Sequence, residues 1–390
     1  MSLEPCRAAS IDAVLVPGLV NAHSHLDLGG HAPLPATGDF TGWLLGIGAT
    51  RQAARDVAER AEREARQLLR SGATAVGDVD GTGGEGARGR RRSTLRGVSY
   101  LEVVGVRRDD ARSRLARMLE AIDRLGAGTG DLGLSPHAPY SVHADVLPEI
   151  ARAASRRGLP LAMHLAETEE ETRYLLHGDG PFARFLEVIG RGAPFERPPG
   201  LRPIAYAEAA GLLEAGCVVV HGNDLDDDDI GILARHAASV VYCHGTHRHF
   251  DRPAHRLGDL LTAGVNVALG TDSGLSNRGV DLFAELRRLA RERSDLPPVA
   301  LLAAATTGGR RALRLDPGAA CFAPGSTADA LLVGPAPNQA EQLGAQGLLQ
   351  WLLHGEDPVL ASWHHGEPVT PLDAADGRTS GLLDTLRAQG

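Results

Sequence analysis

Eight short apolar segments, each followed by a longer amphipathic stretch, predict an α/β protein whose strands form a parallel sheet closed into a (β/α)8 TIM barrel. The pattern extends over about the 250 residues that are typical of this barrel. Histidine or acidic side chains also end several of the segments, and a barrel gathers its strand ends on one face. The expected strands are residues 18–26, 73–79, 98–106, 131–135, 160–165, 218–221, 239–243 and 265–269.

The stretches between these strands favour helices, because they combine good helix formers with regularly spaced apolar residues. The four aspartates at 226–229 are expected to form a first helical turn, where carboxylates meet the positive end of the helix dipole. Residues 39–43 and the glycine-rich stretch 80–92 are expected to be loops. Helices are predicted at 51–70, 109–125, 144–157, 168–189, 281–293 and 299–313.

The length of 390 residues exceeds that of a typical single domain and predicts a barrel with a smaller attached piece. We assign residues 17–315 to the barrel. Residues 1–16 and 316–390 are expected to form a small β-rich accessory domain, with strands within 326–333 and 358–369.

Composition excludes several classes of function. The formal net charge of -9 argues against non-specific nucleic-acid binding, and no apolar run approaches the roughly 20 residues that span a bilayer. Scattered cysteines and the lack of a signal-peptide pattern predict a cytoplasmic protein. The chain has no lysine, which excludes a Schiff-base lysine, a P-loop lysine and a carbamylated lysine bridging two metals.

The stretch PGLVNAHSHLDL contains two histidines, His23 and His25, one residue apart. Positions i and i+2 of a strand share a face, so both side chains can bind one metal ion. Histidine or acidic residues also stand at the ends of four later strands. In chain order these are His137, the pair His164 and Glu167, His221, and Asp272. The face that carries them is therefore expected to be a metal site.

With these residues in place, the sequence resembles the amidohydrolase superfamily, and within it the aminohydrolase branch. That branch includes deaminases of adenosine-like compounds (aminofutalosine deaminases among them), guanine and cytosine deaminases, and triazine chlorohydrolases. The motifs that carry the resemblance are PGLVNAHSHLDL, SPHAPYSV, MHLAETEEE, VVVHGNDL, VVYCHGTHRHF and VALGTDSGLSN.

The resemblance implies a role for each matching residue. The ligands of a single divalent metal match His23, His25, His164 and Asp272. Three imidazoles and one carboxylate suit Zn²⁺, with Fe²⁺ as the alternative. Asp272 is also expected to accept a proton from the attacking water. Glu167 matches the general acid and base, His221 the histidine beside the developing oxyanion, and His137 a histidine of the substrate pocket.

Two departures from the family pattern stand out. The stretch after the seventh strand reads Cys243-His244-Gly245-Thr246, where the family often has Cys-Pro-Arg-Ser/Thr. His247, in the same stretch, is a candidate substrate contact. Only about sixteen residues precede Pro17, so the β-sandwich that family members build from both termini is expected to be either reduced or truncated.

We therefore expect a mononuclear metal-dependent hydrolase that releases ammonia from an amino-substituted heterocycle, such as an adenine-containing nucleoside. One alternative is dechlorination or cyclic-amide opening at the same centre. Another is a non-catalytic barrel that binds a ligand. An anion-capturing role for the Arg88–Arg92 cluster is a further hypothesis, and a homodimer is the expectation that the resemblance supports.

Overall fold

The computed structural model describes residues 13–36, 40–53, 55–126, 130–316, 322, 325–334 and 340–369. Eight parallel strands form one sheet in the order in which they occur in the chain. They are β2 (Leu19–Ser24), β3 (Ala73–Asp80), β4 (Arg96–Val103), β5 (Leu132–Pro136), β6 (Leu161–Leu165), β7 (Cys217–His221), β8 (Ser239–Tyr242) and β9 (Asn266–Leu269). A parallel bridge between Ser24 and Asp272 connects the two edges, so the sheet is nearly closed into the predicted barrel.

The strands are apolar on both faces because the inside of the barrel and the surrounding helices both cover them. In β7 all five residues, CVVVH, are buried, and the same holds for all eight residues of β3. All eight strands lie within or close to the segments expected from the sequence. Short apolar segments that end in a polar residue were therefore sufficient to predict the strands of this sheet.

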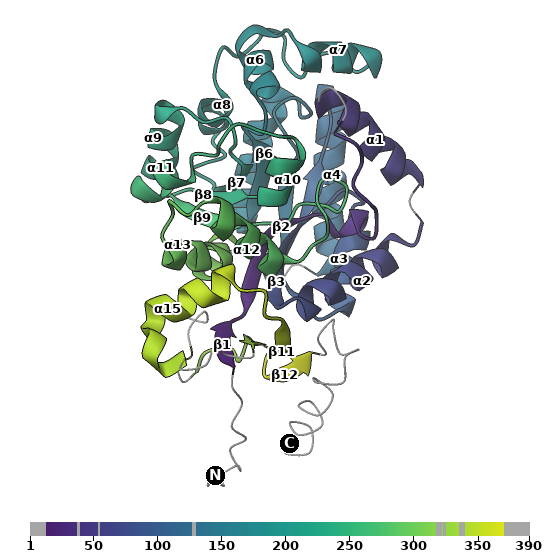
Figure 1. Cartoon of the computed structure of the whole chain (residues 1–390). Helices are drawn as coiled ribbons and strands as arrows, with labels where there is room; N and C mark the ends of the chain where they lie inside the picture. Colours follow the sequence, from purple (N-terminus) through teal and green to yellow (C-terminus); the bar gives the residue numbers. More distant parts are fainter. Residues whose placement is uncertain are drawn as a thin grey trace.

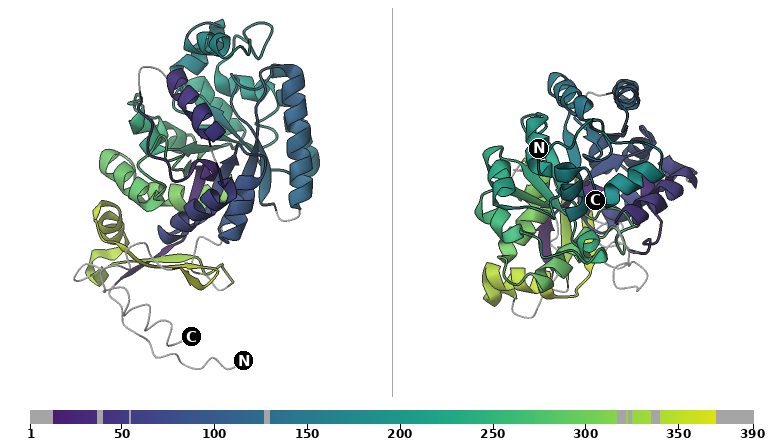
Figure 2. Two further views of the ribbon diagram at one scale, coloured as in Figure 1. Left: turned by 90° about the vertical axis from the view of Figure 1, so that its right-hand side faces the viewer. Right: turned by 90° about the horizontal axis from the view of Figure 1, so that it is seen from above.

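Helices surround the barrel (Figures 1 and 2). They are α1 (Phe40–Ala53), α2 (Val57–Arg70), α3 (Glu85–Arg92), α4 (Arg108–Leu125), α5 (Leu147–Arg157), α6 (Glu169–His177), α7 (Pro181–Val188), α8 (Pro203–Ala209), α9 (Asp227–Arg235), α10 (His244–His249), α11 (Leu257–Thr262), α12 (Leu282–Glu292), α13 (Pro298–Ala303) and α14 (Gly309–Ala312). A π-helical turn, Ala304–Gly308, joins α13 to α14. The four aspartates begin α9 as expected, with a capping box between Asp226 and Asp229.

Several predicted boundaries are wrong. Residues 40–43 are the first turn of α1 rather than a loop, and the single helix predicted at 51–70 is the end of α1 followed by α2. Asp56, at the start of α2, has a positive φ of 51°, which a continuous helix does not allow. The predicted helix 168–189 is likewise two helices, α6 and α7, and the glycine-rich stretch 80–92 contains α3.

A separate antiparallel sheet contains β1 (Val14–Pro17), β10 (Ala330–Val333), β11 (Val359–His364) and β12 (Glu367–Val369), in that order. Segments from both ends of the chain thus form one small sheet, as the sequence predicts. The helix α15 (Ala340–His354) lies between β10 and β11 in the chain. Since β1 leads directly into β2, the small sheet lies at the N-terminal end of the barrel strands (Figure 2). Among the described residues, no helix is both long and apolar enough to cross a membrane.

Candidate active site

Strand β2 delivers the first two histidines to the C-terminal end of the barrel. His23 lies in β2 and His25 follows its last residue. Side chains two positions apart share one face of a strand. The two imidazole rings accordingly lie 4.9 Å apart, centre to centre. This is the arrangement that the His-x-His pattern predicts.

Backbone carbonyl groups orient two of the histidine rings. The Nδ1 atom of His25 lies 3.2 Å from the oxygen of Val79, and the Nδ1 atom of His164 lies 2.9 Å from the oxygen of His137. A carbonyl oxygen can only accept a hydrogen bond, so these two contacts are made by the tautomer in which Nδ1 carries the proton and Nε2 keeps its lone pair. This is the second-sphere contact that metal-binding histidines use.

Asp272 faces the histidines with one carboxylate oxygen. Its Oδ1 lies 3.4 Å from Nε2 of His23 and 3.5 Å from Nε2 of His25. Its Oδ2 accepts hydrogen bonds from the hydroxyl groups of Ser276 at 2.8 Å and Thr246 at 3.1 Å. One oxygen is thus anchored while the other points toward the ring nitrogens.

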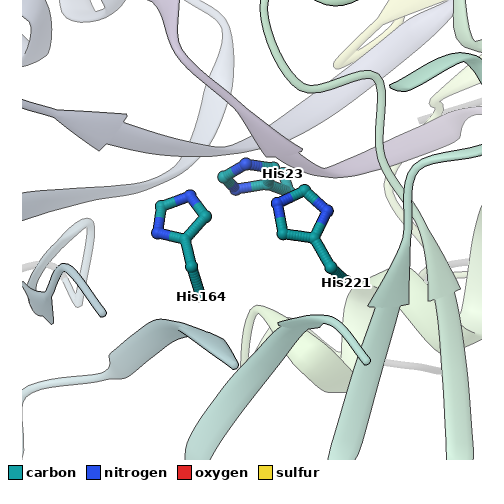
Figure 3. Close-up of side chains that lie close together, drawn as sticks. All are labelled: His23, His164 and His221. Atoms are coloured by element: carbon teal, nitrogen blue, oxygen red, sulfur yellow. The ribbon is translucent and has the colours of Figure 1, made fainter. Parts of the chain in front are cut away.

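These donors fit a divalent metal. His23, His25 and Asp272 can each bring a donor atom within 4.8 Å of the others, and so can His23, His164 and His221 (Figure 3). The Nε2 atom of His23 is buried and has no hydrogen-bond partner among the described residues. Buried imidazoles together with a carboxylate form a donor set that zinc prefers.

The histidines are in the protonation state that binds metal. Burial is the largest cause that lowers the pKa of His25 to about 3, with a further contribution from His23. Burial also lowers the pKa of His221 to about 3 and that of His164 well below its ordinary value. All three rings are therefore neutral at pH 7, and a metal does not have to displace their protons.

Glu167 lies beside this cluster, with Oε1 3.7 Å from Nε2 of His221. Burial, reinforced by the charge of Asp272, raises the pKa of Glu167 well above its ordinary value, so the group can hold a proton at neutral pH. Glu171 holds the backbone around Glu167 in place. Its carboxylate accepts hydrogen bonds from the backbone N–H groups of Ala166 at 3.1 Å and of Glu167 at 3.0 Å. Glu171 was not predicted to have a role, because an acidic run at a helix start is usually solvated.

Three strand ends near the cluster adopt an unusual backbone conformation. Ala166 (φ 51°), His221 (φ 75°) and Asp272 (φ 55°) follow or end β6, β7 and β9. Positive φ is uncommon for residues other than glycine, and such strain collects at functional sites. At His221 the backbone oxygen lies 3.0 Å from the imidazole of His255, a residue that the sequence did not single out.

Two neighbouring cavities open from this site. An inner cavity of about 50 Å³ is lined by Glu167, by His25, His164, His221 and Asp272 of the cluster, and by residues of α1. An outer cavity of about 640 Å³ adjoins it, and both share walls that include His137, Tyr140 and Arg51. His137 therefore lines both cavities, and its predicted contact with a substrate stays a prediction.

His247 lies elsewhere. Its ring contacts Tyr242, with ring centres 5.3 Å apart, and its Nδ1 lies 3.2 Å from the side-chain oxygen of Asn223. It does not line either of the two cavities described above. Its predicted contact with a substrate stays a prediction.

The arginine cluster at 88–92 does not face the cavities. Arg90 is 2% exposed on α3 and donates hydrogen bonds to the backbone oxygen of Leu95 and to Asp131. Arg91 also binds Asp131, which directly precedes β5. These partners lie at the N-terminal ends of the strands, opposite the site, so the hypothesis that Arg90 and Arg91 capture an anionic substrate group is wrong.

Comparison with known proteins agrees with this geometry. The chain is 33% identical over 319 residues to an aminodeoxyfutalosine deaminase of Deinococcus radiodurans, covering 77% of this chain and 73% of the relative. It is 29% identical over 365 residues to a 5-methylthioadenosine/S-adenosylhomocysteine deaminase of Haloarcula marismortui, covering 89% and 79%.

A crystal structure of an adenosine deaminase from Xanthomonas campestris with bound zinc superimposes with a TM-score of 0.72 at 25% identity, covering 97% of this chain and 85% of that one. The zinc of that protein and the histidine and aspartate cluster described above together support a divalent metal. The family model for amidohydrolases matches residues 14–362, and the chain therefore belongs to the amidohydrolase family.

Proposed function

We propose that this protein is a metal-dependent aminohydrolase that removes the exocyclic amino group of an adenine nucleoside as ammonia. The observation that carries the proposal is the buried Glu167, whose carboxylate lies 3.7 Å from Nε2 of His221 beside a cluster of histidines and one carboxylate; burial raises its pKa well above the ordinary value. The relatives support it, because the named activities of those reported above are deaminations of adenosine or its derivatives.

One divalent ion, zinc in the simplest case, would be held by Nε2 of His23, His25 and His164 and by Oδ1 of Asp272. Such an ion supplies a water molecule that is activated for attack at neutral pH. The orientation of the His25 and His164 rings by carbonyl oxygens and the free Nε2 of His23 support this ligand set.

The remaining chemistry belongs to the side chains. Glu167 donates its proton to the ring nitrogen next to the attacked carbon, and Asp272 accepts a proton from the water. His221 donates a hydrogen bond to the oxygen that gains negative charge. A new C–O bond forms, and Glu167, ionised by its first transfer, takes the hydroxyl proton of the addition intermediate and passes it to the amino group. The C–N bond then breaks, ammonia leaves, and the proton held by Asp272 returns to Glu167 to complete the cycle.

The substrate class follows from the relatives and the cavity. The relatives are named for aminodeoxyfutalosine, for 5-methylthioadenosine and S-adenosylhomocysteine, and for adenosine. In this chain the outer cavity of about 640 Å³ adjoins the inner one and leaves room for the sugar and a 5′ substituent. We assign the contact with the heterocycle to His137, a proposal supported by its position in the walls of both cavities.

The test combines elemental analysis of the purified protein with ammonia release from a panel of adenosine derivatives, aminopurines and pyrimidines. We expect about one zinc or iron per chain and release of ammonia from adenine nucleosides. Removal of the metal by a chelator should abolish the release, and added Zn²⁺ should restore it. One metal per chain without ammonia release would contradict the deaminase assignment while leaving the metal site intact.

A further inference from the structure

Glu102, at the C-terminal end of β4, is a buried carboxylate that uses only one of its two oxygens. The side chain is 2% exposed, and its Oε2 accepts a hydrogen bond from Nη1 of Arg51 at 2.8 Å. Its Oε1 has no hydrogen-bond partner within the part of the chain that the structure describes. A buried acceptor without a donor is costly, so a donor from a bound molecule is expected there.

The free oxygen belongs to an ionised group. Burial alone would raise the pKa of Glu102, but the neighbouring Arg51 guanidinium outweighs it, and the pKa is lowered to about 2. An ionised carboxylate accepts hydrogen bonds and donates none. The missing partner of Oε1 must therefore be a hydrogen-bond donor.

The position of Glu102 identifies that partner. Glu102 lines the outer cavity, and its Oε1 lies 4.0 Å from Nε2 of His137, which lines both cavities. Glu167 lies in the inner cavity. A heterocycle bound in the inner cavity would extend its ring substituent into the adjoining outer cavity, which Glu102 lines.

We infer that Glu102 accepts hydrogen bonds from the sugar hydroxyl groups of the substrate and so selects ribonucleosides. The inference rests on the proposed deaminase function and narrows its substrate class. A single carboxylate oxygen has two lone pairs and can accept from both hydroxyls of a diol. A cationic partner is disfavoured, because the three arginines of the cavity wall (Arg51, Arg117 and Arg191) outnumber its two carboxylates, Asp110 and Glu102.

The test compares two ligands that cannot release ammonia, by calorimetry with the metal-loaded protein. Purine riboside has no amino group to lose, and its 2′,3′-dideoxy analogue also lacks both hydroxyls. We expect the wild-type protein to bind purine riboside at least about 10-fold more tightly than the analogue, the preference expected for hydrogen bonds to a charged acceptor. Glu102→Gln, which keeps the shape but removes the charge, should lose most of this preference by weakening only the riboside.

Asp27→Asn provides the matched control. Asp27 is 2% exposed and is the other carboxylate beside Arg51, with its Oδ2 3.4 Å from Nε of Arg51. This variant disturbs Arg51 without removing the free oxygen of Glu102, so it should keep the preference for the riboside. A Glu102→Gln variant that binds both ligands equally weakly would show that Glu102 only supports Arg51.

The outcomes separate this inference from the proposed function. Equal affinity of the wild-type protein for the two ligands, or binding of neither, would overturn the role of Glu102. Ammonia release from adenosine, measured in parallel, decides on the deaminase. A protein that prefers the riboside but releases no ammonia would retain the Glu102 subsite and lose the proposed reaction.

Discussion

Glu167 is the side chain on which the proposed reaction depends most, because it supplies the protons that a hydrolytic deamination needs. Glu167→Gln preserves the shape of the side chain and removes the transferable proton. We expect kcat to fall by at least about 100-fold, the low end for general acid–base catalysis. The bound metal should remain, because Glu167 is not one of the proposed donors. Steady-state ammonia release and elemental analysis of the same preparation measure both effects.

Glu169→Gln is the control for this change, since Glu169 is exposed and begins the same acidic run at the start of α6. It should leave kcat within about two-fold of wild type, as expected of a surface substitution. If kcat fell equally in the two variants, the acidic residues at the start of α6 would support the structure of the site rather than transfer protons. Full activity of Glu167→Gln would remove Glu167 from the mechanism.

The sequence predicted the residues that stand in a motif at a strand end, and it missed those that act through tertiary contacts. His23, His25, His164 and Asp272 gather as their positions predict. Glu102 also ends a strand, but its meaning depends on Arg51, which approaches it from α1. No local pattern connects two residues 51 positions apart, so only the structure reveals the pair.

At the scale of the element, helix boundaries were less predictable than strands, and glycine explains why. α1 contains Gly42, Gly46 and Gly48, and α3 contains Gly86 and Gly89. Isolated glycines disfavour a helix by about 1 kcal/mol each relative to alanine, which is why these stretches were predicted to be loops or helix starts. In α3 the close approach to α2 requires glycine, since a Cβ on Gly89 would lie 2.2 Å from the backbone oxygen of Ala58. Tertiary packing therefore overrides local propensity here.

The position of α3 changes what its arginines are expected to do. Arg90 donates to the hydroxyl of Ser99 at 2.8 Å, to the oxygen of Leu95 at 2.9 Å and to Asp131 at 3.1 Å. Arg90→Ala should lower the free energy of unfolding by about 1–3 kcal/mol, because the buried oxygens of Leu95 and Ser99 lose a donor while Asp131 keeps its pair with Arg91. KM for the substrate should not change, because Arg90 lies at the opposite end of the barrel. Denaturant titration and steady-state kinetics test the two parts.

Arg88 provides the comparison within the same helix. Its side chain is 53% exposed, and the ion pair to Glu85 is 3.6 Å long. Exposed pairs contribute little, so Arg88→Ala should change the unfolding free energy by less than about 1 kcal/mol. A rise in KM on Arg90→Ala with unchanged stability would restore a substrate role for this cluster.

At the scale of the whole molecule, one buried ion cluster joins the small sheet to the barrel. Asp329, directly before β10, pairs with Arg310 of α14 at 3.1 Å and with Arg96 of β4. Its Oδ1 accepts the backbone N–H of His365 at 2.9 Å, and Nδ1 of His364 in β11 lies 3.5 Å from it. The sequence predicted both sheets but not this connection, because its members are spread over the length of the chain.

The charge of Asp329 makes this connection sensitive to pH. Burial alone would raise the pKa of Asp329, but the nearby His364 ring, the hydrogen bond from the backbone N–H of His365 and the charge of Arg96 outweigh it and lower the pKa below its ordinary value. An aspartate in the unfolded chain has a pKa of about 3.9. Because the folded value is lower, the stabilisation is present above pH 4 and is lost as the pH falls from about 4 toward the folded value.

Asp329→Asn should therefore lower the unfolding free energy at pH 7 by about 3–5 kcal/mol, because Arg310 stays buried without its partner. The difference in Tm between the variant and the wild-type protein should shrink below about pH 4, where the wild-type carboxylate also begins to lose its charge. Asp295→Asn, which removes an exposed partner of Arg293, is the control and should shift Tm little at any pH. Thermal melts of the three proteins from pH 3 to 7 measure the effect. If the Tm difference stayed constant over that range, the stabilisation would not depend on the charge of Asp329, and the small sheet would be held to the barrel by packing alone.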